Sequence, residues 1–370
     1  MIKICDVVET LERLAPSLLA EKWDNVGLIT GSPADEVNSV IITLDVTEET
    51  IAFALKKGAS LIVSHHPPIF EPLKNLSGNS LSSRVIRRAV SKNIAILASH
   101  TNLDQAPDGV SHALAEKLNL TDIRTLTQGN CELFKFVTFC PPEYTDRIRD
   151  ASGHAGAGVI GNYSLCSFTS RGTGTYIPSE GSAPFEGKHR ELSRAEEDRI
   201  EIIVPAVFVQ NVITEVKSVH PYEEMVYDII PVSAKEPSFG YGATGNLAQA
   251  MKLTNFIERV CSSLEIDSVK CSTGLHKKIK RVAVMGGSGG DYISAAINEG
   301  ADAYVTGEID HHEYIENHDA IVLVDATHRA TELPVLEIIK AQLESSPELK
   351  GIKTIVDRGT SPFKTLRMKK

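Results

Sequence analysis

Two adjacent histidines, His65 and His66, follow a short apolar run and precede a pair of prolines. The apolar residues 61–63 predict the end of a buried strand, which the prolines prevent from continuing. Neighbouring side chains of a regular strand face opposite sides of a sheet, so two adjacent imidazoles can serve one site only where the strand ends. Their position therefore favours metal ligation over the alternative of one buried and one solvated histidine.

Two further segments pair a histidine with an acidic residue four positions later. His100 precedes Asp104, His328 precedes Glu332, and each histidine comes shortly after an apolar stretch that predicts a strand. If a helix begins near His328, the spacing puts His328 and Glu332 on one face, as a two-point metal clamp requires. Each acid could instead form a turn, cap a helix or lie in solvent. The repetition of the pattern favours metal binding.

The predicted metal ligands are three imidazoles and two carboxylates: His65, His66, Asp104, His328 and Glu332. The set contains no thiolate, so it favours zinc, with iron, manganese, cobalt or nickel as alternatives, over calcium. Five ligands exceed what one tetrahedral ion uses while it keeps an open position. We therefore expect two divalent metal ions per subunit, with a bridging water that is deprotonated near neutral pH.

Several other residues have a less specific interpretation. Three histidines are expected beside the metal ligands or facing a substrate, although each could cap a helix or pack in the core: His100, His311 and His312. Asp45 and Asp24 are interpreted as turn residues, and Trp23, the only tryptophan, as a core residue. The glycine-rich stretch 285–291 could cradle a phosphate, but it fits neither G-x-x-x-x-G-K-[ST] nor G-x-G-x-x-G. A tight turn that lets a helix pack closely explains it at least as well.

The elements that must position these residues follow a repeated pattern. Residues 40–66 and 281–312 each predict a strand, a helix, a Gly-Ala pair, a second strand and a pair of histidines. Such units favour parallel strands joined by a right-handed crossover. Ligands of open α/β sheets bind beyond the carboxyl ends of the strands, where the histidines and acids are expected. We therefore predict an α/β fold with a duplicated core.

Residues 128–236 follow a different pattern of elements, β-α-β-β-α-β, which is typical of the ferredoxin-like α+β arrangement. We interpret them as a domain inserted between the two halves of the core, residues 1–127 and 237–370. A polar segment at 179–198 joins the two central strands. Because it is rich in glycine, proline and charge, it is predicted to be a mobile, exposed loop.

Composition narrows the classes of function. The net charge of −10 argues against nucleic acid as the main partner. The six cysteines include no C-x-x-C pair, so a cysteine-rich zinc site is not indicated and a cytoplasmic location is expected. Residues 1–19 carry acidic residues within an amphipathic helical pattern, which is not typical of a signal peptide. No apolar run approaches the length of a membrane span.

The chain resembles the Nif-three-like family, many of whose members are labelled GTP cyclohydrolase 1 type 2 homologs. The resemblance rests on EKWDNVGL, LDVTEETI, LIVSHHPPIF, SHTNLD, GGSGGD, GADAYVTGE and the terminal H-x-x-x-E, in that order. It implies a dinuclear metal centre held by the five predicted ligands. It also implies a toroidal homohexamer whose metal sites face an internal cavity.

Other features of the resemblance concern the inserted domain and the site. The predicted inserted domain ends in HPYEEMVYDIIP, which resembles the end of the inserted domain in the longer family members. That domain of the longer members is similar to nitrogen-regulatory PII and CutA proteins. Two positions depart from the family pattern. Thr327 stands where a glycine is usual, and Glu308 stands in T-G-E where T-G-D is usual. These departures leave the predicted ligand set intact.

Two classes of function are open at this point. The first is a metal-dependent hydrolase that acts on a nucleotide-like or phosphorylated substrate through a metal-bridging hydroxide, with His100 or His312 moving protons. The second is a non-catalytic scaffold for metal trafficking or ligand sensing, which the predicted inserted domain motivates because PII-like modules bind effectors.

Overall fold

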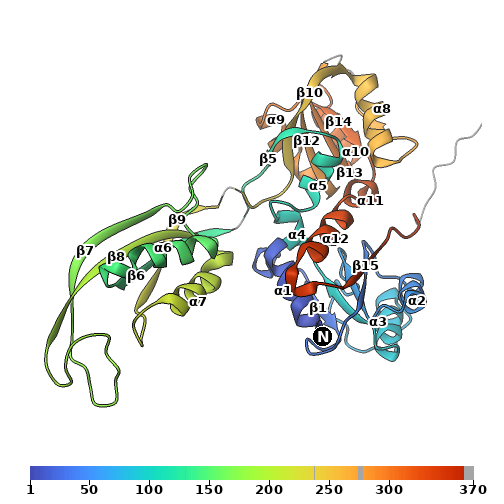
Figure 1. Ribbon diagram of the computed structural model, residues 1–370. Coiled ribbons are helices and arrows are strands. Elements are labelled where there is room, and N and C mark those ends of the chain that lie inside the picture. The colour runs from blue at the N-terminus through green and yellow to red at the C-terminus, as the bar shows by residue number, and fades with distance from the viewer. Residues whose placement is uncertain (130, 237, 274–277, 362–370) are drawn as a thin grey trace, which may run out of the picture. The chain divides into compact units, whose positions relative to one another are not determined.

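The computed structural model describes residues 1–129, 131–236, 238–273 and 278–361 (Figure 1). It divides into two compact units, one formed by residues 1–129 and 237–370 and the other by residues 130–236. Residue 237, where the sequence predicts that the second half of the core begins, lies outside the described residues. None of the described helices combines the length and the apolar character that crossing a membrane requires.

The first sheet of the larger unit has five strands in the order β1-β4-β3-β2-β15. The four strands from β4 to β15 are parallel, and β1 runs antiparallel to β4. The strands are β1 (Gly27–Thr30), β2 (Ser39–Thr43), β3 (Leu61–Ser64), β4 (Ala95–Ala98) and β15 (Lys353–Asp357). The helices that pack with this sheet are α1 (Ile4–Leu14), α2 (Glu48–Lys57), α3 (Leu81–Ser91), α4 (Thr101–Gln105) and α12 (Val335–Ser345), with the 3₁₀ helices η1 (Ser17–Leu19) and η5 (Pro347–Leu349) nearby in the chain.

Helices cover both faces of this sheet, so every residue of β2, β3 and β4 is buried. Val40 and Ile42 of β2 share one core with residues of α1 and α12, whereas Ile41 packs on the opposite face with α2 and α3. The alternation follows from strand geometry. Burial on both faces explains the continuous apolar runs of these strands.

The second sheet of the larger unit has six strands in the order β11-β14-β13-β12-β10-β5. Its three central strands β12, β13 and β14 are parallel, and the flanking strands are antiparallel to their neighbours. The strands are β5 (Thr121–Thr125), β10 (Ala243–Lys252), β11 (Lys270–Cys271), β12 (Lys278–Ser288), β13 (Ala303–Gly307) and β14 (Val322–Asp325). The accompanying helices are α5 (Val110–Lys117), α8 (Leu253–Leu264), η4 (Gly290–Tyr292), α9 (Ile293–Asn298), α10 (His311–Asn317) and α11 (His328–Glu332).

One order of elements occurs in both sheets, as β2-α2-β3-α3-β4 and as β12-α9-β13-α10-β14. Gly58 follows α2 and Gly300 follows α9, with φ of 70° and 69°. Glycine is favoured where a helix ends in this left-handed conformation. The Gly-Ala pairs of the sequence therefore mark equivalent points of the two sheets.

Each half of the larger unit contributes an edge strand to the sheet of the other half. β5 comes from the first part of the chain but pairs with β10 in the second sheet, and β15 comes from the last part but pairs with β2 in the first. In Figure 1 the C-terminal helix α12 accordingly lies beside α1, where Val335 and Ile339 share a core with Ile4 and Val7. Helix α5 contributes to both cores, with Val110 in one and Leu114 in the other. The two sheets are thus tied together at several points.

The smaller unit contains four antiparallel strands in the order β7-β8-β6-β9 and two helices. Along the chain the elements are β6 (Glu132–Cys140), η2 (Pro142–Tyr144), α6 (Thr145–His154), β7 (Ser167–Tyr176), β8 (Ser193–Pro205), η3 (Ala206–Phe208), α7 (Val209–Val219) and β9 (Tyr227–Lys235). Ile148 of α6 and Val212 of α7 are buried with Phe136 of β6 in one core. The order of elements in this unit is therefore β-α-β-β-α-β.

The exposed loop predicted at residues 179–198 is shorter than the sequence indicates. β8 already begins at Ser193, which pairs with Tyr176 at the end of β7. At the far end of this stretch Asp198 is buried and accepts a hydrogen bond from Arg171 of β7. The prediction was wrong for residues 193–198. Their charged side chains suggested a solvated loop, whereas Glu196 and Asp198 of β8 form ion pairs with Arg171 of β7.

Candidate functional site

The five predicted metal ligands lie together in the larger unit. Glu332 is at their centre: its Oε1 lies 2.9 Å from His328 Nε2 and 3.7 Å from His65 Nε2. Its Oε2 lies 3.3 Å from His66 Nε2, and Asp104 Oδ1 lies 3.8 Å from His65 Nε2. Side chains from distant parts of the sequence thus converge on a carboxylate that is only 3% exposed.

Strand ends and two short helices position these side chains. His65 and His66 directly follow β3, and Asp104 lies on α4, which begins shortly after β4. His328 and Glu332 are the first and last residues of α11, which follows β14 of the other sheet. All five therefore lie beyond the carboxyl ends of parallel strands, where ligands of α/β sheets commonly bind.

His100 joins the cluster as a fourth imidazole. Its ring centroid lies 5.3 Å from that of His65 and 5.6 Å from that of His66. Two groups of residues bring possible ligand atoms within 4.8 Å of one another: His65, His66 and His100 form the first, and His66, His328 and Glu332 the second. Either group could hold a metal ion. Asp104 belongs to neither group, and its Oδ1 lies 3.8 Å from His65 Nε2.

The Nδ1 atoms of these four histidines all have an oxygen partner outside the cluster. The pairs are His65 with the Ser99 carbonyl (3.0 Å), His66 with Asp45 (2.9 Å), His100 with Asp24 (2.9 Å) and His328 with Glu308 (3.1 Å). Since a carbonyl or carboxylate only accepts, each Nδ1 carries the hydrogen and donates it. These bonds fix the orientation of each ring and leave Nε2 as its remaining ring nitrogen, an arrangement typical of histidines that bind metals.

Two buried atoms of the cluster make no hydrogen bond within the described part of the chain, namely His65 Nε2 and Glu332 Oε2, although Oε2 lies 3.3 Å from His66 Nε2 as an ion pair. Burying a polar atom without a partner is costly, so such atoms need an explanation. A divalent cation between them would satisfy both, because imidazole nitrogen and carboxylate oxygen are its ordinary ligands. The residues present therefore fit a metal ion.

The histidines and carboxylates of the cluster shift one another's pKa values. Burial alone would lower the pKa of His66, but its hydrogen bond with Asp45 and its ion pair with Glu332 outweigh burial and raise that pKa to about 10. The bond with Glu332 raises the pKa of His328 to about 9 despite burial. Burial would raise the pKa of Glu332, yet the surrounding histidines hold it well below its usual value. A cation that binds here must therefore displace protons from the imidazoles.

Glycines of the 285–291 stretch allow the ligands of α11 to approach β12. A Cβ on Gly287, whose φ is 70°, would lie 2.6 Å from Glu332 Oε1 and 3.4 Å from the His328 ring. The Gly287 amide also donates to Thr331 Oγ1 at 3.0 Å. The expectation of a close-packed turn thus accounts for this glycine, and what packs against it is the His328–Glu332 pair.

Three carboxylates of the site were not predicted as site residues: Asp24, Asp45 and Glu308. Asp45 was interpreted as part of a capping turn, but Thr47 caps α2 and Asp45 accepts from His66. The side chain of Asp24 is buried and also accepts from the Thr101 amide and hydroxyl, at 3.0 and 2.5 Å. Glu308 could have been found from the repeat, because aligning the two Gly-Ala pairs places it opposite His66. Aligning the two histidine pairs instead hides this correspondence.

The remaining predictions have different outcomes. Trp23, expected in the core, is 64% exposed, so that interpretation was wrong. His311 and His312 begin α10, are exposed, and have rings 5.7 Å from each other. Neither is in the groups of possible ligands found among the described residues, so a role for them beside the site stays a prediction.

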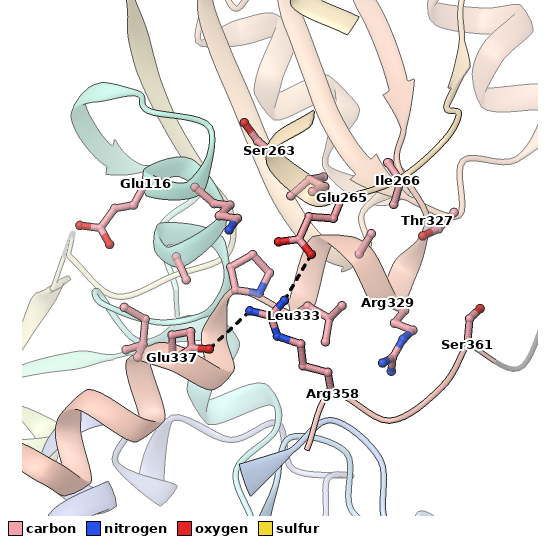
Figure 2. Close-up of a pocket in the computed structure, with 16 residues that line it drawn as sticks. Glu116, Ser263, Glu265, Ile266, Thr327, Arg329, Leu333, Glu337, Arg358 and Ser361 are labelled. Atoms are coloured by element: carbon pink, nitrogen blue, oxygen red, sulfur yellow. Dashed lines mark hydrogen bonds and ion pairs between the residues drawn. The ribbon is translucent and has the colours of Figure 1, made fainter. Parts of the chain in front are cut away.

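A separate pocket of about 470 Å³ adjoins α11 (Figure 2). Its lining includes Arg329 and Ala330 of α11 but neither His328 nor Glu332. Arg358 extends across it and pairs with Glu265 and Glu337, each at 3.5 Å. The histidine–carboxylate cluster and this pocket therefore use different residues of α11.

The fold and the histidine–carboxylate cluster define an α/β protein with a possible metal site. The chain belongs to the DUF34/NIF3 (NGG1p interacting factor 3) family, whose model matches residues 2–361, which confirms the resemblance noted from its motifs. It is 38% identical over 343 residues to a Halalkalibacterium halodurans protein called "GTP cyclohydrolase 1 type 2 homolog", covering 91% of each chain. A Bacillus subtilis protein of that name is 38% identical over 332 residues, covering 88% of each.

Solved structures give the same placement. A Bacillus cereus protein described as related to NIF3 has a TM-score of 0.85 and 36% identity, with 99% of each chain covered. A Staphylococcus aureus protein has a TM-score of 0.71 and 29% identity, again with 99% of each chain covered.

Proposed function

We propose that this protein binds two divalent metal ions around Glu332 and uses them to hydrolyse a nucleotide-like or phosphorylated substrate. The proposed ligands are His65, His66, Asp104, His328 and Glu332. Zinc suits this donor set first, with iron, manganese, cobalt or nickel as alternatives. The observation that carries the proposal is the set of oriented imidazoles, whose Nδ1 atoms are all bound elsewhere while their rings surround a buried carboxylate.

The environment of Glu332 supports two ions rather than one. Its Oε1 faces His65 and His328, whereas its Oε2 faces His66. A carboxylate whose two oxygens face different imidazoles can bridge a pair of cations. Asp104 adds a second negative charge on the side of His65, which helps to neutralise the added positive charge.

Bound in this site, the two ions would lower the pKa of a coordinated water and polarise a substrate oxygen. The protein's own residues supply rigidity, because Asp45 and Glu308 hold the rings of His66 and His328 in place. His100 is held in the same way by Asp24 and is 13% exposed. It is therefore placed to accept or donate a proton at Nε2.

The relatives' name makes GTP the first substrate to test. Purified protein should be loaded with each candidate metal and assayed against GTP and a panel of other phosphorylated compounds, with His65→Ala and His328→Ala as inactive controls. An anomalous-scattering map, together with elemental analysis of protein that was not purified on a metal column, gives the number and identity of the ions. We expect two ions per chain and turnover that both substitutions abolish. Turnover no higher than in these controls across the panel would remove the hydrolase proposal.

The alternative function is a non-catalytic scaffold for metal trafficking or ligand sensing. It is favoured by the β-α-β-β-α-β order of the smaller unit, which we propose to be an inserted ferredoxin-like domain similar to PII and CutA proteins. Tight metal binding without catalysis, together with a ligand that changes the conformation of the segment between β7 and β8, would support it. Full cellular function in a variant that lacks residues 128–236 would contradict it.

The family resemblance also leads us to propose a toroidal homohexamer with the metal sites facing an internal cavity. Light scattering on the purified protein tests the assembly, with six subunits of 40.2 kDa each as the expected mass. A monomer or dimer at micromolar concentration would contradict it.

A further inference from the structure

We infer that Trp23 and Phe70 form an aromatic rim that binds the planar ring of a substrate whose anionic group reaches the metal cluster. The aromatic rim is defined by these two side chains. The assignment of the anion to the cluster rests on the proposed function, whereas the assignment of the ring rests on the two aromatic residues alone.

Both residues of the aromatic rim expose much of their surface while contacting the cluster. Trp23 is 64% exposed and Phe70 is 53% exposed. Their ring centroids lie 6.2 Å and 5.6 Å from that of His100, with interplanar angles of 73° and 85°. Single exposed apolar residues are ordinary on a protein surface. Two large aromatic rings against one histidine of a metal-ligand cluster are more specific.

Hydrogen bonds attach the segments that carry the rim to the site. The side chain of Asp24, next to Trp23, is buried and accepts from His100 Nδ1 at 2.9 Å. Asn25 Nδ2 donates to the carbonyl of Ile69 at 2.8 Å, one residue before Phe70. The backbone on which each ring stands is thus fixed near His100. Holding the backbone of the rim in place reduces the entropy that is lost when a ligand binds.

The chemistry of the rim and of the cluster selects the ligand class. Aromatic side chains bind planar bases by stacking, a contact that tolerates different bases because every base has a π face. The cluster, once loaded with cations, attracts a phosphate or carboxylate. His100 connects the two regions, since its ring lies beside those of His65 and His66 and also beside both rings of the rim. A heterocyclic ring joined to an anionic group matches this arrangement, whereas a sugar phosphate matches only the cluster.

The test uses the metal-loaded full-length protein and two probes, GMP and ribose 5-phosphate, which share a phosphate but differ in the ring. Calorimetric titration measures both affinities in the wild type, Trp23→Ala and Phe70→Ala. Phe168→Ala is the matched control, because Phe168 is 65% exposed and lies on β7 of the smaller unit. Trp23 is the only tryptophan, so quenching of its fluorescence by GMP gives a second, local readout, with free N-acetyltryptophanamide as the correction for absorption by the base.

We expect GMP to bind the wild type more tightly than ribose 5-phosphate and to quench Trp23. Each rim substitution should weaken GMP binding roughly tenfold and leave ribose 5-phosphate binding and metal content unchanged. Phe168→Ala should bind GMP as tightly as the wild type. Equal affinities for the two probes, GMP affinity unchanged by both rim substitutions, or no GMP binding at all would each overturn the aromatic rim.

The rim and the proposed function fail in different ways. If the protein takes up no metal, the proposed function fails, but quenching of Trp23 by GMP that Phe70→Ala shifts to roughly tenfold higher GMP concentration would still support the rim. If metal binds and GTP is turned over while the rim substitutions leave GMP affinity unchanged, the rim alone is overturned.

Discussion

Gly287 offers a direct test of the position of Glu332, because its substitution by alanine adds a single methyl group next to the carboxylate. The new Cβ would lie 2.6 Å from Glu332 Oε1, whereas ordinary contact begins near 3.4 Å. The carboxylate must therefore move by about 0.8 Å, or the backbone must shift by a similar amount. Displacements of this size at a functional group cost roughly 100-fold in activity, and disturbing the residues that orient a metal ligand costs about 10–100-fold in affinity.

Gly300 provides the matched control. Its φ of 69° is nearly that of Gly287, 70°, but a Cβ there meets no atom within 4 Å. Alanine in the left-handed conformation costs roughly 1–2 kcal/mol, so both variants should lose at least this much unfolding free energy in the metal-free state, and Gly287→Ala should lose more because the buried Glu332 must also move. Only Gly287→Ala should also lose metal affinity.

The assay combines urea unfolding of the metal-free proteins with calorimetric titration of zinc. We expect about 10–100-fold weaker zinc binding in Gly287→Ala, equivalent to about 1.4–2.8 kcal/mol, and wild-type affinity in Gly300→Ala. Equal zinc affinity in the two variants would refute the reasoning, because Glu332 Oε1 would then not contribute to the metal site. Should Gly287→Ala fail to fold, Glu332→Gln tests the same carboxylate without changing the backbone.

Three further predictions concern the cluster. Asp45→Asn replaces the carboxylate that orients His66, so zinc affinity should fall about tenfold or more with the fold intact; calorimetry that shows unchanged affinity would contradict this role. In the metal-free protein the pKa of His66 is raised to about 10 and that of His328 to about 9, above the usual value near 6.5 for the unfolded chain. The folded state thus holds protons more tightly, and the unfolding free energy in urea should be greatest below pH 6.5 and fall by ~2–5 kcal/mol as pH rises through 9 to 10; a rise over this range would contradict the coupling. Adding zinc should raise the melting temperature more at pH 8 than at pH 6, because protons compete with the metal for the imidazoles; an equal shift at both values would count against ligation by histidine.

Much of the site could be predicted from local sequence patterns. His65 and His66 can be placed at a strand end without tertiary information, because an apolar run precedes them and two prolines follow. The i, i+4 spacing likewise puts His328 and Glu332 on one face of α11. Because the carboxyl ends of parallel strands share one edge of a sheet, the pattern also predicted which residues would lie close together.

Tertiary structure decided what depends on contacts between distant segments. The carboxylates of Asp24 and Asp45 look like ordinary turn residues in the sequence, since a bond to an imidazole far along the chain leaves no local pattern. The exchange of β5 and β15 between the sheets is hidden for the same reason, because an edge strand has the same composition whichever sheet it joins. The sequence by itself determined the elements and the histidine–carboxylate donor set. Only folding, which brings both ends of the chain to one buried carboxylate, decided how each imidazole is oriented and what surrounds it.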